Sequence, residues 1–115
     1  MSRRSHSRVA ARRRAHAPVF AALGDKTRLS LVAKLCKGQP YSISQLTMGS
    51  KLTRQAITKH LRVLERAGIV HSVHAGRESL FEFDPGPVEE IKEYLDLVSE
   101  QWDQALARLK AFVER

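Results

Sequence analysis

The sequence contains a single cysteine among its 115 residues. One thiol cannot form an internal disulfide, and no Cys-x-x-Cys pair is present to hold a structural metal or to act in thiol exchange. Cys36 falls at the end of an apolar helical pattern, where we expect it to pack in the core as a small hydrophobic residue. This cysteine usage is typical of a reducing compartment, and we expect a cytoplasmic protein.

Long apolar runs are also missing. No run approaches the roughly 18 residues of a membrane-spanning helix, and the N-terminus lacks the apolar segment of a secretory signal. We therefore expect a soluble protein with no membrane partner. The Arg- and Ser-rich start also resembles an organelle transit peptide, and composition alone leaves that alternative open.

Acidic residues are scarce at the N-terminal end. Six arginines and no acid precede Ala15, whereas residues 88–115 hold seven acids against four bases. The net charge of +8 and the sequence pI near 10.3 predict a polyanionic partner, nucleic acid before membrane. Residues 1–16 have little apolar content, so we expect a flexible basic arm ahead of a domain spanning 17–115. The arm can contact DNA or be a passive tail.

Arrangements of residues that support catalysis or metal binding are absent too. No nucleophile is paired with a base, no phosphate-binding loop is present, and 115 residues leave room for only one domain and one core. His71 and His74 lie three residues apart in an expected strand, so their side chains point to opposite faces. We expect no enzymatic activity, no metal site and no cofactor.

What is present is a helix-turn-helix pattern between Ser42 and Gly68. Ser42 with Gln45 is a capping box, and Gly49 ends the first short helix. Thr53 can cap a second helix, and Gly68 provides the left-handed residue that ends it. The second helix buries one face, formed by Ile57, Leu61 and Leu64.

The opposite face of this second helix is polar and mostly cationic. An α-helix fits the DNA major groove, and such side chains can reach base edges or phosphates. We therefore expect DNA contacts from Thr53, Arg54, Gln55, Thr58, Lys59 and Arg62. The alternative is a solvated amphipathic helix whose charges only aid solubility.

Two helices and a hairpin flank this motif. Residues 19–23 form a short apolar helix that Gly24 ends, and Asp25 caps a scaffold helix whose apolar stripe is Leu29, Val32, Ala33 and Cys36, widened by Leu31 and Leu35. After the second helix of the motif, which we call the recognition helix, residues 69–84 alternate β-branched and aromatic residues around a Gly-containing turn, which predicts a β-hairpin. Arg77 at its tip can contact phosphates or the minor groove, or face solvent.

The chain closes with a break at residues 84–87 and a long helix from Val88 nearly to the end. Its apolar residues alternate by four and three, which is a heptad seam. A helix of roughly 40 Å outruns so small a domain, and we expect the seam to join two copies of the chain. The seam includes Ile91, Leu95, Val98, Trp102, Ala105, Leu109 and Phe112.

These elements together resemble the ArsR family of winged-helix bacterial transcriptional repressors. The resemblance rests on residues 20–29, residues 56–70 and the wing pair Gly76-Arg77. It implies a mainly α winged helix-turn-helix fold in which the first and last helices join two subunits, with Phe20 in that interface. It also implies that His60 lies near the DNA backbone, although a histidine at the edge of the core fits the pattern as well.

The sequence departs from the family's metal sensors. The arsenic-type cysteine pair is missing, and the last helix contains no histidine for the family's zinc site. Residues 99–109 resemble a metal-independent branch instead. The resemblance thus implies a homodimeric, sequence-specific repressor on a pseudo-palindromic operator, with an inducer that the sequence does not disclose. A metal- or redox-responsive sensor, a non-specific architectural DNA binder and a protein-interaction module are the alternatives.

Overall fold

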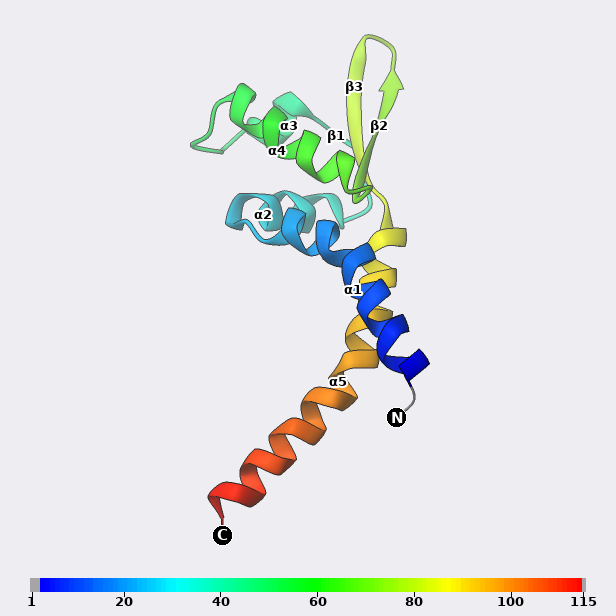
Figure 1. Cartoon of the computed structure of the whole chain (residues 1–115). Coiled ribbons are helices and arrows are strands. Elements are labelled where there is room, and N and C mark those ends of the chain that lie inside the picture. Colours follow the sequence, from blue (N-terminus) through cyan, green and yellow to red (C-terminus); the bar gives the residue numbers. More distant parts are fainter. Residues whose placement is uncertain (1–2, 115) are drawn as a thin grey trace.

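Helices make up most of the structure, a computed structural model that describes residues 3–114 (Figure 1). One strand before the helix-turn-helix and two strands after it form a three-stranded antiparallel sheet, and the molecule extends over 63 × 31 × 22 Å. The predicted fold class, mainly α with a hairpin wing, is confirmed. The elements in order are α1 (Arg3–Leu23), α2 (Lys26–Leu35), β1 (Tyr41–Ser42), α3 (Ile43–Thr47), α4 (Arg54–Arg66), β2 (Val70–Ala75), β3 (Glu78–Phe83) and α5 (Pro85–Val113).

Helix α1 begins much earlier than the sequence suggests. It runs continuously from Arg3 to Leu23, and the expected arm-to-domain boundary at residue 17 falls inside it. The expectation of a flexible arm over 1–16 is therefore corrected for residues 3–16, while residues 1–2 lie outside the described part. Alanine and arginine favour helix, and the buried Val9 packs against Tyr94 and Val98 of α5. That contact comes from a distant segment, so composition did not reveal it.

The core lies between the two helices of the helix-turn-helix, α2 and the sheet. Its fully buried side chains are Leu35, Leu46, Ile57, Leu61, Leu64, Ile69 and Val70. Helix α2 turns Leu31 and Leu35 inward, whereas Leu29 is 53% exposed. Cys36, predicted to be buried, is exposed at the end of α2. Helix α2 has apolar residues on several of its own faces, so the spacing of these residues could not decide which stripe faces the core.

The hairpin follows the prediction, and one strand was missed. Strands β2 and β3 pair from Val70 opposite Phe83 to Ala75 opposite Glu78, joined by the two-residue turn Gly76-Arg77. Gly76 has φ 64°, the left-handed value that favours glycine at this position. Phe81 is buried and packs in the same core cluster as the helices. Strand β1 pairs with the other side of β3, but two residues are too short for a sequence pattern.

Helix α5 starts at Pro85, three residues before the predicted start at Val88. Asp84 caps it by accepting a hydrogen bond from the backbone N–H of Gly86 at 2.9 Å. The first turn of a helix has no intrahelical acceptors for its N–H groups, so prolines are tolerated there rather than breaking the helix. In Figure 1 the first part of α5 lies beside α1, and the rest leads away from the domain.

The predicted dimerisation residues therefore divide into two groups. Ile91 and Val98 are 5% and 3% exposed because they pack inside the protomer, and the Phe20 ring lies edge-on to Tyr94 with centroids 6.0 Å apart. Leu95 is half-buried, whereas Trp102 and Leu109 are exposed. None of the described helices is both long and apolar enough to span a membrane.

Candidate nucleic-acid interface

Local capping interactions hold the helix-turn-helix in place. Ser42 and Gln45 form the predicted capping box, with Ser42 Oγ accepting from the Gln45 N–H at 3.1 Å and Gln45 Oε1 accepting from the Ser42 N–H at 2.8 Å. Thr53 Oγ1 accepts from the Ala56 N–H at 3.1 Å and so starts α4. At the other end Gly68 has φ 77°, as predicted for the residue that ends this helix. These interactions set where the recognition helix begins and ends.

The outward face of α4 carries the predicted DNA-contacting residues. Ile57, Leu61 and Leu64 face the core, and Arg54, Gln55, Thr58 and Lys59 together line a shallow hollow on the surface. The one acid of α4, Glu65, accepts a hydrogen bond from Ser72 Oγ at the base of the wing. The hollow is thus lined by hydrogen-bonding and cationic groups, which match the acceptors in the major groove.

Two of these side chains already make hydrogen bonds within the protein. Arg54 Nη1 donates to Ser44 Oγ at 2.7 Å, which holds the arginine across α3. Thr58 Oγ1 donates to the Arg54 carbonyl at 2.7 Å, leaving its oxygen as an acceptor and its methyl group for apolar contact. Gln55 and Lys59 are exposed and lie on the same hollow.

The wing and the recognition helix meet in a second hollow. Arg54 of α4 and Arg77 of the hairpin turn both line it, together with the hydroxyl-bearing Ser44 and Ser79 and the carboxylate of Glu78. The structure thus brings together two arginines that are 23 positions apart in the sequence. Ser44 and Ser79 were not among the predicted site residues, and isolated serines carry no sequence signal that could have identified them.

A third hollow lies between α2 and the turn that precedes α4. Its rim carries Lys26, Lys34 and Lys51, and its apolar base is formed by Leu31 and Ile57 among others. None of the side chains that line it is acidic. This arrangement extends the positive surface from the helix-turn-helix onto α2.

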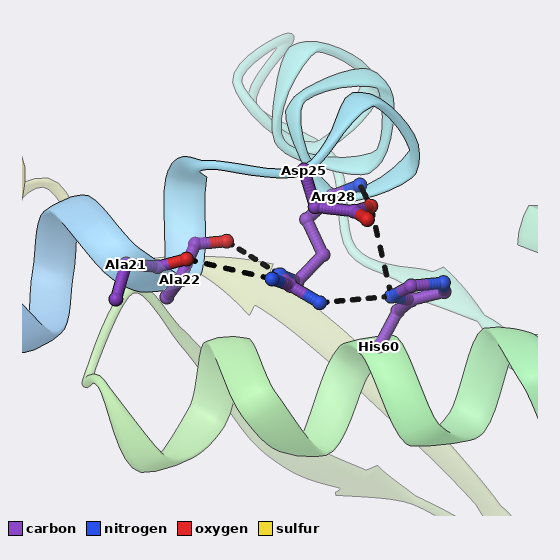
Figure 2. A network of polar contacts seen from close by, with 5 residues as sticks. All are labelled: Ala21, Ala22, Asp25, Arg28 and His60. Carbon is purple, nitrogen blue, oxygen red and sulfur yellow. Dashed lines mark hydrogen bonds and ion pairs between the residues drawn. The ribbon is translucent and has the colours of Figure 1, made fainter.

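His60 is on α4 but does not share the face of the other predicted contacts. Its Nδ1 lies 3.2 Å from Arg28 Nη1 and 3.8 Å from Asp25 Oδ2, so the ring faces the start of α2 (Figure 2). The structure therefore favours the core-edge reading of His60. Arg28 had no predicted role, because its contacts are to residues that are distant in sequence or belong to the backbone.

Asp25 is the N-cap of α2 and the acidic member of this network. It accepts a hydrogen bond from the Arg28 N–H at 3.0 Å, and this bond is the main cause that lowers the pKa of its carboxyl group. Desolvation opposes the shift, while the nearby charge of Arg28, and that of His60 when its ring is protonated, add to it. The carboxylate is thus the favoured form in the folded protein.

His71 and Cys36 lie outside the Arg28–His60 network. His71 Nε2 lies 3.1 Å from Glu82 Oε2 across the hairpin, and Cys36 is exposed near Gln39 and Phe83. Among residues 8–114, whose side chains the structure describes, no group of three or more His, Cys, Asp or Glu side chains is placed to hold a metal ion. That the protein senses no metal stays a prediction.

Known proteins resemble this chain in sequence and in structure. The family model described as "Bacterial regulatory protein, arsR family" matches residues 25–72, from the cap of α2 into β2. The HTH-type transcriptional regulator YuzN of Bacillus subtilis (strain 168) is 35% identical over 79 residues, which cover 64% of this chain and 86% of YuzN. The HTH-type transcriptional regulator Rv2034 of Mycobacterium tuberculosis (strain H37Rv) is 32% identical over 85 residues, covering 74% and 76%.

A solved structure shares both the fold and the sequence pattern. An ArsR-like transcriptional regulator from Rhodococcus sp. RHA1 has a TM-score of 0.71 and 35% identity, covering 84% of this chain and 91% of that one. Since these relatives are transcriptional regulators, the prediction that the chain is not an enzyme is confirmed. The chain belongs to the arsR family of bacterial regulatory proteins, which are winged helix-turn-helix transcription regulators that bind double-stranded DNA.

Proposed function

We propose that the protein is a homodimeric transcriptional repressor that occupies a pseudo-palindromic operator through α4 and the wing of each subunit. The observation that carries the proposal is the outward face of α4, where Arg54, Gln55, Thr58 and Lys59 line one hollow without an acid. A dimer bound across a promoter blocks it by occupancy alone, so repression requires no further surface.

The bases would be contacted by the side chains that are free to enter the major groove of DNA. The amide of Gln55 can pair with adenine, Lys59 can donate to guanine, and the methyl group of Thr58 can contact the methyl group of thymine. Arg54 is held by Ser44 next to the wing, which suits a base at the groove edge or a phosphate. These four side chains would therefore determine the operator sequence.

Phosphate contacts would position the protein without reading sequence. The candidates are Arg62 on α4, Arg77 on the wing and the lysines beside α2, because each is cationic and Arg77 lines one hollow with Arg54. Thr53 at the N-terminus of α4 can add a hydroxyl contact. Affinity should then fall steeply with salt, with a slope of roughly 0.9 per phosphate neutralised.

The exposed end of α5 supports the dimer. Beyond Val98 its apolar side chains face outward, with Trp102, Leu106, Leu109 and Phe112 all more than half exposed. A second copy of the same helix would cover them and hold two recognition helices one helical turn of DNA apart. Ile91 and Val98 would stabilise the helix from inside the protomer rather than form the seam.

Footprinting on DNA upstream of the protein's own gene, followed by competition with random duplex, tests the proposal. A repressor protects a defined two-part site and resists competition by random DNA. A protein that random duplex displaces at equal mass is an architectural binder instead. Reversing the charge of Lys59 without any effect on binding would leave only the protein-interaction alternative.

We also propose that metal ions do not directly drive DNA release. The scattered histidines and the single cysteine are the basis for this. Zinc, nickel, copper and arsenite titrated into the protein–operator complex should leave it intact at stoichiometric dose. Release that Cys36→Ser abolishes would make the protein a thiol-dependent sensor, since Cys36 is exposed.

A further inference from the structure

A side-chain network joins three helices at one point behind the recognition helix (Figure 2). The guanidinium of Arg28 donates through Nε to the carbonyl of Ala22 and through Nη2 to the carbonyl of Ala21, 3.4 Å away, both in the last turn of α1. Its third nitrogen, Nη1, donates to His60 Nδ1 on α4 at 3.2 Å. One planar group on α2 thus contacts both α1 and α4.

The chemistry of the two side chains sets the direction of the hydrogen bond to His60. An arginine stays protonated and has only donors, so Nδ1 of His60 must be the acceptor and must carry no proton. The histidine side chain is 24% exposed and the contact is partly buried, so solvent competes for it less than at an open surface. The Asp25 carboxylate lies 3.8 Å from His60 Nδ1. This is close enough to attract a positive charge on a protonated ring, but it is too far for a hydrogen bond.

The other contacts that hold α4 are mostly apolar. Ile57, Leu61 and Leu64 pack into the core, and such packing is strong but has no preferred direction. Hydrogen bonds are directional, and the fixed fork of a guanidinium sets the angle between the groups that it joins. The polar joint therefore adds an orientation that apolar packing alone does not supply.

On the side away from α4, Arg28 contacts α1, and α1 in turn packs against α5. Val9 packs against Tyr94 and Val98, and Phe20 lies against the Tyr94 ring, so α1 and α5 form one packed unit. The exposed part of α5 continues from that unit. A path of contacts thus runs from the helix proposed to hold the second subunit, through α1 and Arg28, to the recognition helix.

We infer that Arg28 is a positioning residue for operator binding, which acts through His60 Nδ1 to fix the angle of α4 relative to the α1–α5 unit. The inference rests on the proposed function, because the angle matters only where two joined α4 helices read two half-sites. Its signature is a loss of binding free energy on the complete operator that exceeds twice the loss on a single half-site, because the complete operator is bound by two subunits. The preference for one spacing between the two half-sites should also weaken, because without the Arg28–His60 contact each α4 can change its angle separately.

The matched pair His60→Asn and His60→Leu tests the acceptor. Asparagine places an oxygen at the position of Nδ1, and leucine has the same branched shape without a polar atom. We expect the asparagine variant to bind the footprinted operator within about twofold of wild type, and the leucine variant to bind about tenfold more weakly, since one hydrogen bond to a charged group is lost. Equal affinities of the two variants would overturn the inference.

Arg28→Met and the double variant Arg28→Met/His60→Leu complete the cycle. The double variant should lose no more than Arg28→Met alone, because Arg28→Met already removes the contact with His60 together with the two hydrogen bonds to α1. Additive losses would show separate roles and overturn the joint. An operator lengthened by one base pair between its half-sites should weaken wild-type binding more than binding by Arg28→Met, and an equal effect would reduce Arg28 to a local structural residue.

Two controls separate this inference from the proposed function. Circular dichroism at the assay temperature establishes folding, and if Arg28→Met does not fold, the histidine pair still decides the matter. Lys59→Ala should weaken binding by the same factor at each half-site, so that the fold-loss on the complete operator is about the square of the fold-loss on the single half-site. If Lys59→Ala has no effect on either DNA, the proposed reading face is wrong, whatever the Arg28 variants do.

Discussion

The two halves of α5 have the same apolar spacing but opposite surroundings. Ile91 and Val98 in the first half are 5% and 3% exposed, whereas Trp102 and Leu109 in the second half are 55% and 59% exposed. The first half is covered by α1 and the core, and the second half extends past them (Figure 1). A heptad pattern thus predicts that a helix face is covered, but it does not identify which part of the same chain, or which second chain, covers it.

Truncating the buried half should have the largest effect on stability. Ile91→Ala removes a core side chain and should lower the free energy of unfolding by about 2–5 kcal/mol. In a variant made monomeric by Trp102→Glu, Leu109→Ala should change the free energy of unfolding by less than about 0.5 kcal/mol, because the side chain is exposed in the single protomer. Urea denaturation measures both, and equal losses would contradict the division of α5 into two halves.

Charging the exposed half should leave folding intact and remove the second subunit. Trp102→Glu would bury a carboxylate at the proposed seam, so the variant should sediment as a monomer and bind the complete operator at least about tenfold more weakly. Glu100→Gln, two residues away on the same helix, is the matched control and should remain dimeric. Wild-type protein that sediments as a monomer at micromolar concentration would argue against the dimer.

A change on α4 separates DNA contact from dimerisation. Thr58→Ala or Gln55→Ala should weaken operator binding by about 1–3 kcal/mol each and leave sedimentation and unfolding unchanged. Their effect should appear on a single half-site too, unlike that of Trp102→Glu. Fluorescence anisotropy with both DNA lengths measures this, and affinities within a few tenths of a kcal/mol of wild type would remove this face from the interface.

The smallest expected effect concerns acid stability at the α2 cap, which belongs to neither half of α5. The pKa of Asp25 is lowered from its ordinary value of 3.8, so the folded state favours the carboxylate. This contribution is present above that value and is lost as the pH falls through the lower folded pKa. Asp25→Asn keeps a capping oxygen but cannot titrate, so its stability relative to wild type should improve below about pH 4. A constant difference in stability between pH 3 and pH 7 would contradict this.

Most of the reading motif was predictable because its determinants are local. The Ser42–Gln45 capping box, the Thr53 cap, the buried trio of α4 and the glycine at the hairpin turn all occur as predicted. Each depends on residues within one or two turns of one another, which is the range over which capping and periodicity act. The residues of the reading face followed directly, since they lie opposite the buried trio.

The features that were not predicted depend on distant partners. Helix α1 extends to Arg3 with Val9 packed against α5, about 85 residues later in the chain. Cys36 and Leu29 face outward because the core contacts the other side of α2, and His60 faces Arg28 because α2 crosses behind α4. No spacing within a single helix contains that information.

The amino-acid sequence by itself determined where the recognition helix and the wing begin and end, which face of α4 is apolar, and that a long apolar seam closes the chain. Only the tertiary structure decided that the first half of that seam is covered within the protomer, that α1 covers it, and that Arg28 joins α1 to the recognition helix. The physical reason is that caps and turns depend on neighbouring backbone groups, whereas burial and side-chain pairing depend on which distant surfaces meet.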